Sequence, residues 1–303
     1  MFADVKHRWN AALVLCARSV ANALAAGCTV VLKSSELCPW THQFIAETFR
    51  EAGFPAGSVN TVMADRAAGP EITETIIAHP SIRKVEFIGS AAVGRIIGSV
   101  SAKHLKPILM ELGDQSPAIV LDDADLQKAA QLCAQGAMFH QGQVCFSTER
   151  IIVHSSVKDE FTRLLVDAVS KMPIVGTSAV TKAGANKAKA AVDAAIAEGA
   201  KFAYGSSEMV GPASMSPSIL TNVSPKSVIS TGEAFAPTAF VMGFETEEEA
   251  IEEANSRISG LSASVFTKNH ERGLRIAREL EFGSVNINNM TLFAEREYTG
   301  TCV

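Results

Sequence analysis

Residues 18–33, RSVANALAAGCTVVLK, decide the fold class of this chain. Arg18 to Ala26 has the composition of a helix, and Gly27 is placed to end it. Cys28 to Lys33 is a short apolar run with β-branched residues, which is typical of a buried strand. A helix that passes through one glycine into a buried strand predicts an α/β fold.

The same alternation continues toward the C-terminus as far as Ile88. An amphipathic helix closed by Gly53, a strand, a second helix and a further strand follow in turn: Thr41–Ala52, Val59–Val62, Glu71–Ala78 and Lys84–Ile88. This spacing is that of a parallel, doubly wound sheet. Residues 1–112 are therefore predicted to form a partial Rossmann-like dinucleotide-binding domain.

A second α/β domain is predicted to begin near Gly113 and to extend to residue 285, followed by a truncated return segment, 286–303. Asp122 or Asp123 is the expected cap of its first helix. The expected strands are Pro117–Leu121, Glu149–His154 and Ser262–Phe266; the expected helices are Leu126–Phe139, Val157–Lys171, Ala185–Glu198, Glu247–Asn255 and His270–Leu280.

Composition and charge exclude several classes of function. The chain has 303 residues, 47% of them hydrophobic, and a net charge of −5 without a basic stripe, which argues against nucleic-acid binding. No apolar run reaches the length of a membrane helix, and Met1 to Asn10 lacks the apolar core of a signal peptide. The six cysteines have no metal-ligand or disulfide spacing, so we expect no metal and a cytoplasmic location.

One cysteine stands in a distinctive local setting. The segment Gln141-Gly-Gln-Val-Cys145-Phe-Ser-Thr separates the end of a predicted helix from the strand Arg150 to Val153. A cysteine on a glycine-containing loop is able to meet a substrate, whereas a core cysteine is not. On this segment alone, an ordinary thiol remains the more common interpretation.

Several further segments resemble one family in the same order. Met110-Glu-Leu-Gly113 and Gly142-Gln-Val-Cys145 are similar to the glutamate and cysteine motifs of aldehyde dehydrogenases, and 34 residues separate Glu111 from Cys145, as in that family. The resemblance extends from about Arg8 to about Asn289. Its other segments are Trp9-Asn10, Thr29–Lys33 with Glu36, Phe87–Ser90 with Gly94, Glu233–Phe235, Phe244–Ile251 and Gly260–Thr267.

The resemblance implies an oxidoreductase that uses a cysteine nucleophile. Cys145 would attack the aldehyde carbon to give a thiohemiacetal, and hydride transfer to a nicotinamide would leave a thioester. Glu111 would be the base that activates water to hydrolyse this thioester. Asn10 would stabilise the oxyanion together with the backbone N–H of Cys145. The alternative interpretations are a turn residue for Asn10 and a solvated helix cap for Glu111.

The resemblance also assigns the adenosine half of the cofactor. Lys33 and Glu36 match positions that bind the adenosine ribose, although each alone reads equally as a solvated strand end. A carboxylate at position 36 repels a 2′-phosphate, which favours NAD, while Lys33 leaves NADP possible.

The remaining cofactor contacts are assigned in the same way. Gly89 and Ser90 lie between a predicted strand and a predicted helix, where a pyrophosphate is able to approach backbone N–H groups. Glu233 and Phe235 match the residues that hold the nicotinamide ribose and pack on the ring. A loop acid and a core phenylalanine are the alternatives. The chain has no G-x-G-x-x-G fingerprint.

The chain departs from the family pattern in ways that affect this hypothesis. Asp114 and Ala236 replace usual glycines, and Asp114 is expected to raise the pKa of Glu111 by adding a nearby negative charge. Arg8 replaces the proline before Trp9. Segments that the family carries before Trp9 and after Asn289 have no counterpart, so the chain is expected to be truncated at both ends.

Two functions from different classes remain open. One is NAD(P)-dependent oxidation of a small or aromatic aldehyde to a carboxylic acid, as in the salicylaldehyde and benzaldehyde dehydrogenase branch and within aromatic or secondary metabolism. The other is a catalytically inactive, truncated remnant. An acyl-CoA-forming relative is disfavoured because Glu111 is retained. The family forms homo-oligomers, which are doubtful here because the contact segments are missing.

Overall fold

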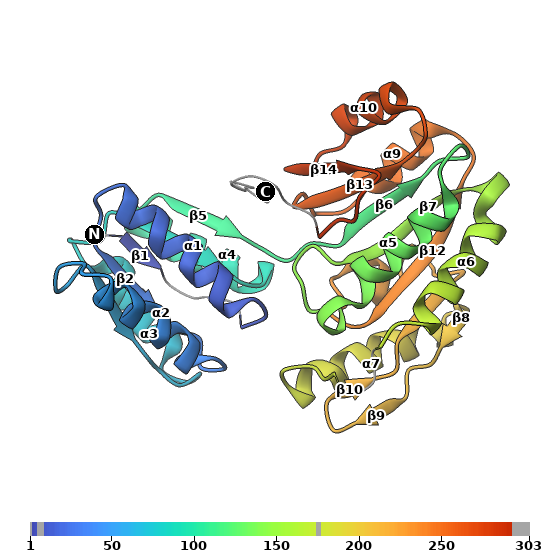
Figure 1. Cartoon of the computed structure of the whole chain (residues 1–303). Coiled ribbons are helices and arrows are strands. Elements are labelled where there is room, and N and C mark those ends of the chain that lie inside the picture. Colours follow the sequence, from blue (N-terminus) through green and yellow to red (C-terminus); the bar gives the residue numbers. More distant parts are fainter. Residues whose placement is uncertain (1, 5–8, 174–176, 293–303) are drawn as a thin grey trace. The chain divides into compact units, whose positions relative to one another are not determined.

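The computed structural model describes residues 2–4, 9–173 and 177–292, and it divides into two compact units, Met1–Leu112 and Gly113–Val303 (Figure 1). Arg8 and most of the predicted return segment, from residue 293 onward, lie outside the described residues. Each unit is an α/β structure with its own sheet, which confirms the predicted fold class. The two units are considered separately below.

The first unit is built on a parallel sheet with the strand order β3-β2-β1-β4-β5. Its strands are β1 (Phe2–Asp4), β2 (Val30–Lys33), β3 (Val59–Val62), β4 (Lys84–Ile88) and β5 (Ile108–Glu111). This order is the doubly wound order of dinucleotide-binding folds, in which the chain reverses direction across the sheet between β1 and β4. Ligands of such sheets bind outside the carboxyl ends of the strands at that reversal.

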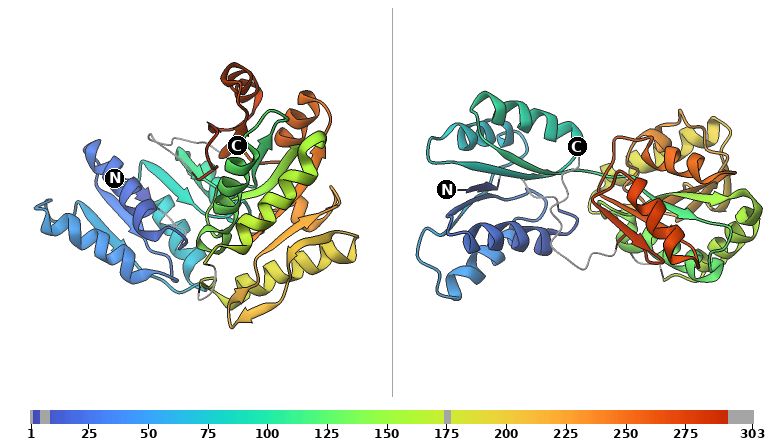
Figure 2. Two further views of the ribbon diagram at one scale, coloured as in Figure 1. Left: turned by 45° about the vertical axis from the view of Figure 1, so that its right-hand side comes forward. Right: turned by 90° about the horizontal axis from the view of Figure 1, so that it is seen from above.

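Helices cover both faces of this sheet (Figure 2). They are α1 (Ala12–Ala25), α2 (Pro39–Glu51), α3 (Gly69–Ala78) and α4 (Ala91–Lys103). One hydrophobic cluster joins α1 and α2 to β2, and a second joins α3 and α4 to β4, because alternate strand residues face opposite sides. Gly27 and Gly53 follow α1 and α2 with positive φ angles of 74° and 87°, as expected for glycines that end helices.

The second unit contains a larger, mixed sheet with the order β14-β13-β6-β7-β12-β11-β8. Within this sheet, the edge pair β8–β11 is antiparallel and the other described pairs are parallel. The strands are β6 (Ser116–Val120), β7 (Thr148–His154), β8 (Lys201–Gly205), β11 (Ser218–Thr221), β12 (Thr238–Phe244), β13 (Ser262–Phe266) and β14 (Ser284–Ile287), with a separate hairpin of β9 (Met209–Gly211) and β10 (Ser214–Met215). The predicted strands correspond to β6, β7 and β13.

Helices again pack on both faces, around three hydrophobic clusters. They are α5 (Leu126–Met138), α6 (Lys158–Ser170), α7 (Lys182–Ala197), α8 (Val228–Thr231), α9 (Glu247–Asn255) and α10 (His270–Glu279). No helix in the described part of the chain has the length and apolarity needed to span a bilayer.

The predicted cap of α5 was wrong by two or three residues. Asp125 is the N-cap, and its Oδ1 accepts a hydrogen bond from the N–H of Lys128 at 3.1 Å. Asp122 instead pairs with Arg272 at 2.8 Å, and Asp123 accepts from the Thr267 hydroxyl. The acidic run therefore serves two purposes: one carboxylate caps the helix and the other two hold α10 and the end of β13.

Candidate active site

The carboxyl edge of the first sheet gathers four of the predicted site residues. Lys33 is the last residue of β2, Glu111 is the last residue of β5, and Gly89 follows β4 directly. Asn10 lies in the connection from β1 to α1. Because parallel strands end at a common edge, the fold brings these residues to the side where doubly wound sheets bind ligands.

Glu111 is a buried carboxyl group at this edge. Its exposed fraction is 6%, and its Oε1 lies 3.4 Å from Nη2 of Arg18. Burial raises the pKa of Glu111 to about 7, partly opposed by Arg18 and assisted by the negative charge of Glu86. The group therefore changes protonation near neutral pH, as a general base should, and the solvated helix-cap interpretation is wrong.

Asp114 has a different role from the one predicted. The charged neighbours that act on the pKa of Glu111 are Arg18 and Glu86, so the expectation that Asp114 raises it is not met. The Asp114 carboxylate accepts hydrogen bonds from Ser116 Oγ at 2.6 Å and from the N–H of Ser262 at 3.1 Å. It thereby joins the start of β6 to β13.

Asn10 carries a buried amide that is not used within the described structure. Its exposed fraction is 7%, and neither Oδ1 nor Nδ2 has a hydrogen-bond partner among the described residues. Leaving such a group unsatisfied costs about 1–3 kcal/mol. An amide kept at that cost is suited to a group from outside the chain, which agrees with the oxyanion role that the resemblance implies.

The adenosine-side residues lie in two different environments. Lys33 has an exposed fraction of 2%, and its ammonium group donates to the backbone oxygen of Ser34 at 3.2 Å. It is therefore not a solvated strand end. Glu36 is half-buried in the short connection between β2 and α2. A buried cation and a nearby acid at a strand end fit a ribose, which offers hydroxyl groups to both.

Gly89 and Ser90 form the turn from β4 into α4. A Cβ added at Gly89 would collide with the ring of Phe87, so this position requires glycine. Ser90 is the N-cap of α4, and its Oγ accepts from the N–H of Val93 at 3.5 Å. The exposed N-terminus of α4 presents N–H groups and the positive end of the helix dipole, which fits a dinucleotide pyrophosphate.

Cys145 lies on a tight turn in the second unit, between the short helix η1 (Phe139–Gly142) and β7. The N–H of Ser147 donates to the oxygen of Val144 at 3.0 Å, and Ser147 Oγ accepts from the N–H of Val144 at 3.3 Å. The predicted loop position is confirmed. Cys145 is itself buried, with an exposed fraction of 9%, but it belongs to none of the five hydrophobic clusters of the described residues, unlike Cys133, whose burial raises its thiol pKa.

The backbone just before this turn is strained. His140, Gln141 and Gly142 have consecutive φ angles of 52°, 59° and 65°, all in the left-handed region. Each non-glycine residue held there costs about 1–3 kcal/mol, and such conformations cluster at functional sites. A Cβ at Gly142 would also collide with the carbonyl oxygen of Ala236, so the glycine permits a close backbone approach.

The loop that carries Glu233 and Phe235 follows α8, and both side chains are half-buried. Phe235 has a φ of 51°, whereas Asp114 and Ala236, where the family usually has glycine, are not in the left-handed region. Glu149, at the start of β7, holds this loop, a role that was not predicted from the sequence. The sequence signal that could have indicated this role is the charged pair Glu149-Arg150 at the start of a mostly apolar strand.

Arg150, the second residue of that pair, is fully buried. Its guanidinium donates to the backbone oxygens of Gln115 at 3.0 Å, Glu253 at 2.7 Å and Ala254 at 2.9 Å. Three carbonyl acceptors satisfy a cation that would otherwise be costly to bury. Arg150 therefore joins the C-terminal end of α9 to the start of β7 and to Gln115, which precedes β6.

The structure leaves one part of the site hypothesis open. The separation of Cys145 from Glu111 or Asn10 is not a property of either unit, so their approach to one carbonyl carbon stays a prediction. Within the described residues, no three His, Cys, Asp or Glu side chains are grouped so that they could hold a metal ion.

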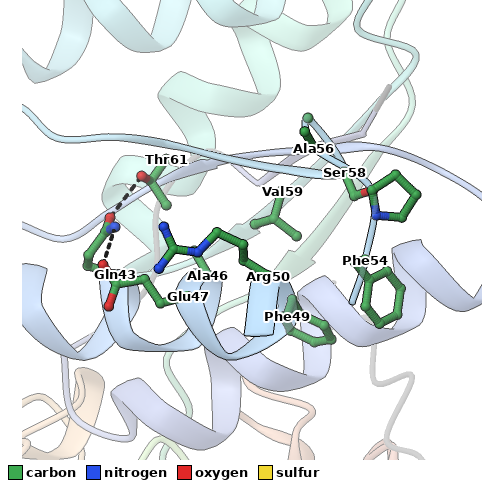
Figure 3. A pocket seen from close by; sticks show the side chains of 12 residues that line it. Gln43, Ala46, Glu47, Phe49, Arg50, Phe54, Ala56, Ser58, Val59 and Thr61 are labelled. Carbon is green, nitrogen blue, oxygen red and sulfur yellow. Dashed lines mark hydrogen bonds between the residues drawn. The ribbon is translucent and has the colours of Figure 1, made fainter. Parts of the chain in front are cut away.

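A cavity of about 290 Å³ lies elsewhere in the first unit, beside α2 and the edge strand β3 (Figure 3). Gln43 and Arg50 line one side of it, and Thr61 Oγ1 donates to Gln43 Oε1 at 2.9 Å. None of the predicted site residues lines this cavity.

The strand order and polar carboxyl edge of the first unit define a dinucleotide-binding fold of the doubly wound class. The chain belongs to the aldehyde dehydrogenase family, whose sequence model matches residues 7–301. A vanillin dehydrogenase of Pseudomonas fluorescens is 40% identical over 298 residues, 95% of this chain and 61% of that protein. A salicylaldehyde dehydrogenase of Pseudomonas sp. strain C18 is 38% identical over 305 residues, 97% of this chain and 62% of that protein.

Solved structures agree with this assignment. A salicylaldehyde dehydrogenase from Pseudomonas putida G7, complexed with salicylaldehyde, matches with a TM-score of 0.92 and 36% identity over 99% of this chain and 64% of that one. A betaine aldehyde dehydrogenase from Staphylococcus aureus in complex with NAD+ matches with a TM-score of 0.89 and 32% identity, over 99% of this chain and 62% of that one. The chain thus spans less than two thirds of the length of these relatives.

Proposed function

We propose that this protein oxidises an aldehyde to a carboxylic acid with NAD+ or NADP+, through a thioester on Cys145. The observation that carries the proposal is Glu111: a buried carboxyl group at the ligand-binding edge of a dinucleotide-type sheet, with a pKa raised to about 7. A buried carboxyl group with that pKa, placed at the edge where such sheets bind ligands, is suited to take a proton from water near neutral pH.

Residues of the first unit would hold the adenosine half of the cofactor. Lys33 and Glu36 would contact the ribose, and the turn of Gly89 and Ser90 would receive the pyrophosphate at the N-terminus of α4. Because a carboxylate at Glu36 repels a 2′-phosphate, NAD+ is the preferred form. When bound, the nicotinamide supplies the hydride acceptor.

The chain's own groups would then act in sequence. The Cys145 thiolate attacks the carbonyl carbon, and the Asn10 amide donates a hydrogen bond to the oxyanion that forms. Loss of hydride from the former carbonyl carbon leaves a thioester on Cys145. Glu111 takes a proton from water, and the hydroxide formed attacks the thioester and releases the carboxylic acid and the thiolate.

An aromatic aldehyde is the substrate class that the relatives support. Both sequence relatives described above are named for aromatic aldehydes, vanillin and salicylaldehyde, and one structural relative was solved with salicylaldehyde bound. We therefore expect benzaldehyde and its hydroxylated forms to be better substrates than short aliphatic aldehydes.

The test is NADH formation by the purified protein with benzaldehyde and NAD+, followed by absorbance. Replacing Cys145→Ala should abolish it, lowering kcat by about 10⁴-fold or more. Cys133→Ala is the matched control, because that thiol lies in the hydrophobic core, 1% exposed, and should leave the rate largely unchanged. Folded protein that forms no NADH, or a Cys145→Ala variant that remains active, would overturn the proposal.

A further inference from the structure

Glu149 makes an unusual set of contacts for a carboxyl group inside a sheet. It is the second residue of β7 and has an exposed fraction of 3%. Its Oε1 accepts hydrogen bonds from the N–H groups of Ala234 and Phe235, both at 3.1 Å, and its Oε2 lies 3.0 Å from the N–H of Ala234. One buried side chain thus binds two successive backbone donors of a loop that lies 85 residues later in the chain.

Gln115, the residue just before the neighbouring strand β6, completes this arrangement. Its Nε2 donates to the backbone oxygens of Ile229 at 2.7 Å and Gly232 at 3.1 Å, and it lies 3.4 Å from Glu149 Oε2. Glu149 therefore accepts from two N–H groups of the segment between α8 and Phe235, and Gln115 donates to two of its carbonyl groups. Side chains from the start of β7 and from the residue before β6 thus satisfy both donors and acceptors of this segment.

The loop needs such support because of its backbone conformation. Phe235 has a φ of 51°, which is uncommon for a bulky residue and costs about 1–3 kcal/mol. Two successive N–H groups that point at one acceptor form a small anion-binding concavity. A carboxyl group in that concavity holds the peptide orientation that places the Phe235 side chain.

The same loop is also fastened to the segment that carries Cys145. Gly142 approaches the carbonyl oxygen of Ala236 too closely for any Cβ, and Gln141 and Phe235 line one small cavity. Glu149 lies four residues after Cys145 in the sequence. The nucleophile segment therefore contacts the loop through Gly142 on one side of Cys145 and through Glu149 on the other.

We propose that Glu149 is a positioning residue of the active site, whose buried carboxyl group sets the conformation in which Glu233 and Phe235 bind the nicotinamide end of the cofactor. The inference rests on the proposed function, because the roles of Glu233 and Phe235 in cofactor binding are part of it. It adds a residue that contacts neither substrate nor cofactor and acts through two backbone N–H groups.

Proton transfer is a less suitable role for Glu149. Its two oxygens are engaged by Ala234, Phe235 and Gln115, and its side chain is buried beneath the loop. Burial raises its pKa to about 8, and the N–H groups of Ala234 and Phe235 act in the opposite direction. In the neutral form of Glu149, a single carbonyl oxygen still accepts both N–H groups. These hydrogen bonds, which anchor the loop to Glu149, therefore do not require a negative charge.

Hydrogen–deuterium exchange on the unaltered protein tests the anchor without any variant. The amide hydrogens of Ala234 and Phe235 lie in a loop without regular secondary structure, yet both should exchange far more slowly than an exposed loop amide such as that of Ile258, which is 83% exposed. Exchange of both amides at the rate of Ile258 would overturn the proposal. This measurement needs neither cofactor nor activity.

Three variants test the consequence for the cofactor. Glu149→Ala removes the acceptor and should raise the KM for NAD+ by roughly tenfold, the equivalent of about 1.4 kcal/mol from two lost hydrogen bonds. Glu149→Gln keeps one acceptor oxygen and should stay within about threefold of the unaltered protein. Ile152→Val is the matched control. It removes one buried methyl group from the same strand, so it should lower Tm without changing the KM for NAD+.

The outcomes separate this inference from the proposed function. A Glu149→Ala variant with lowered Tm and an unchanged KM for NAD+ would show that Glu149 only stabilises the fold, and would overturn the inference. If that variant does not fold, Glu149→Gln and the exchange experiment still decide. If the unaltered protein neither binds NAD+ nor forms NADH, the proposed function fails, while slow exchange at Ala234 and Phe235 would still establish the anchor.

Discussion

The carboxyl edge of the first sheet and the Cys145 region of the second unit are organised in different ways. At the sheet edge, Lys33, Glu111 and Gly89 take their places because each ends or follows a parallel strand. Around Cys145, the chain is irregular, and its shape is imposed by left-handed residues and by a buried side chain, Glu149, that reaches a distant loop. One region is positioned by topology and the other by individual contacts.

This difference has a practical consequence for substitutions. A residue at the sheet edge is expected to lose its chemistry when replaced while the backbone stays in place, since hydrogen bonds between strands hold the edge. Replacing a residue around Cys145 is expected to change the backbone conformation itself, because single side chains and one glycine maintain the loop geometry. The four predictions below test this comparison, from the largest expected effect to the smallest.

Glu111→Gln should separate the two halves of the reaction. Removing the base should slow thioester hydrolysis by about 10²–10⁴-fold, while a first burst of NADH remains, because acylation of Cys145 precedes the step that needs Glu111. Rapid-mixing absorbance measures the burst and the slow turnover that follows. The control is Glu74→Gln, an exposed carboxylate paired with Lys103 at 2.9 Å in the same unit. Loss of the burst together with turnover would contradict the assignment of Glu111 to hydrolysis.

Asn10→Ala should lower kcat/KM for the aldehyde by about 10²–10³-fold, the usual effect of removing one oxyanion donor. Its stability should change little or rise, since the buried amide has no partner among the described residues. Asn60→Ala is the control: its Nδ2 donates to the carbonyl oxygens of Val30 and Gly57, so that variant should lose stability and keep its rate. A reversed pattern would show that Asn10 is structural.

Gly142→Ala should destabilise the second unit by more than the 1–3 kcal/mol of left-handed strain alone, because the new Cβ also collides with the carbonyl oxygen of Ala236. Gly199→Ala isolates the strain, since Gly199 has a φ of 108° and nothing within 4 Å of an added Cβ. Urea denaturation of both variants measures the difference. Equal losses would mean that the loop moves aside easily, which would weaken the distinction between the two regions.

The charges around Glu111 should shift its titration in opposite directions. The kcat should fall as pH drops below about 7, because protonated Glu111 is unable to take a proton from water. Glu86→Gln removes a charge that raises this pKa and should move the fall to lower pH, whereas Arg18→Gln should move it to higher pH. Arg18→Gln should have the larger effect, since Arg18 acts more strongly than Glu86. Shifts of the same sign in pH–rate profiles would contradict this account.

Local pattern predicted the first unit well and the second only in part. Val59–Val62 and Lys84–Ile88 were placed correctly because short β-branched runs between glycines leave few alternatives. In the second unit, β8–β12 and β14 were not predicted, and in the first unit β1 and β5 were missed. Most of these strands are short, and they gain their strand conformation from neighbours distant in the sequence.

The candidate site shows the same limit. The positions of Lys33 and Gly89 follow from predicted strand ends, and the loop position of Cys145 follows from its glycine-containing segment, whereas β5, the strand that ends at Glu111, was not predicted. The effect of Glu86 on Glu111 was attributed to Asp114 because sequence proximity was taken for spatial proximity. The contact of Glu149 with Ala234 spans 85 residues and leaves no local pattern beyond a charged pair at the head of an apolar strand.

The buried guanidinium of Arg150 makes the start of β7 intolerant of a conservative exchange. Its planar fork reaches three carbonyl oxygens in different directions, at 2.7–3.0 Å. A lysine ammonium is a point charge with a tetrahedral set of donors and a larger hydration energy, so it fits neither the geometry nor the dry surroundings. Arg150 thus fixes the C-terminal end of α9 to the start of β7, and a lysine at this position would leave that end of α9 without its hydrogen-bond donors.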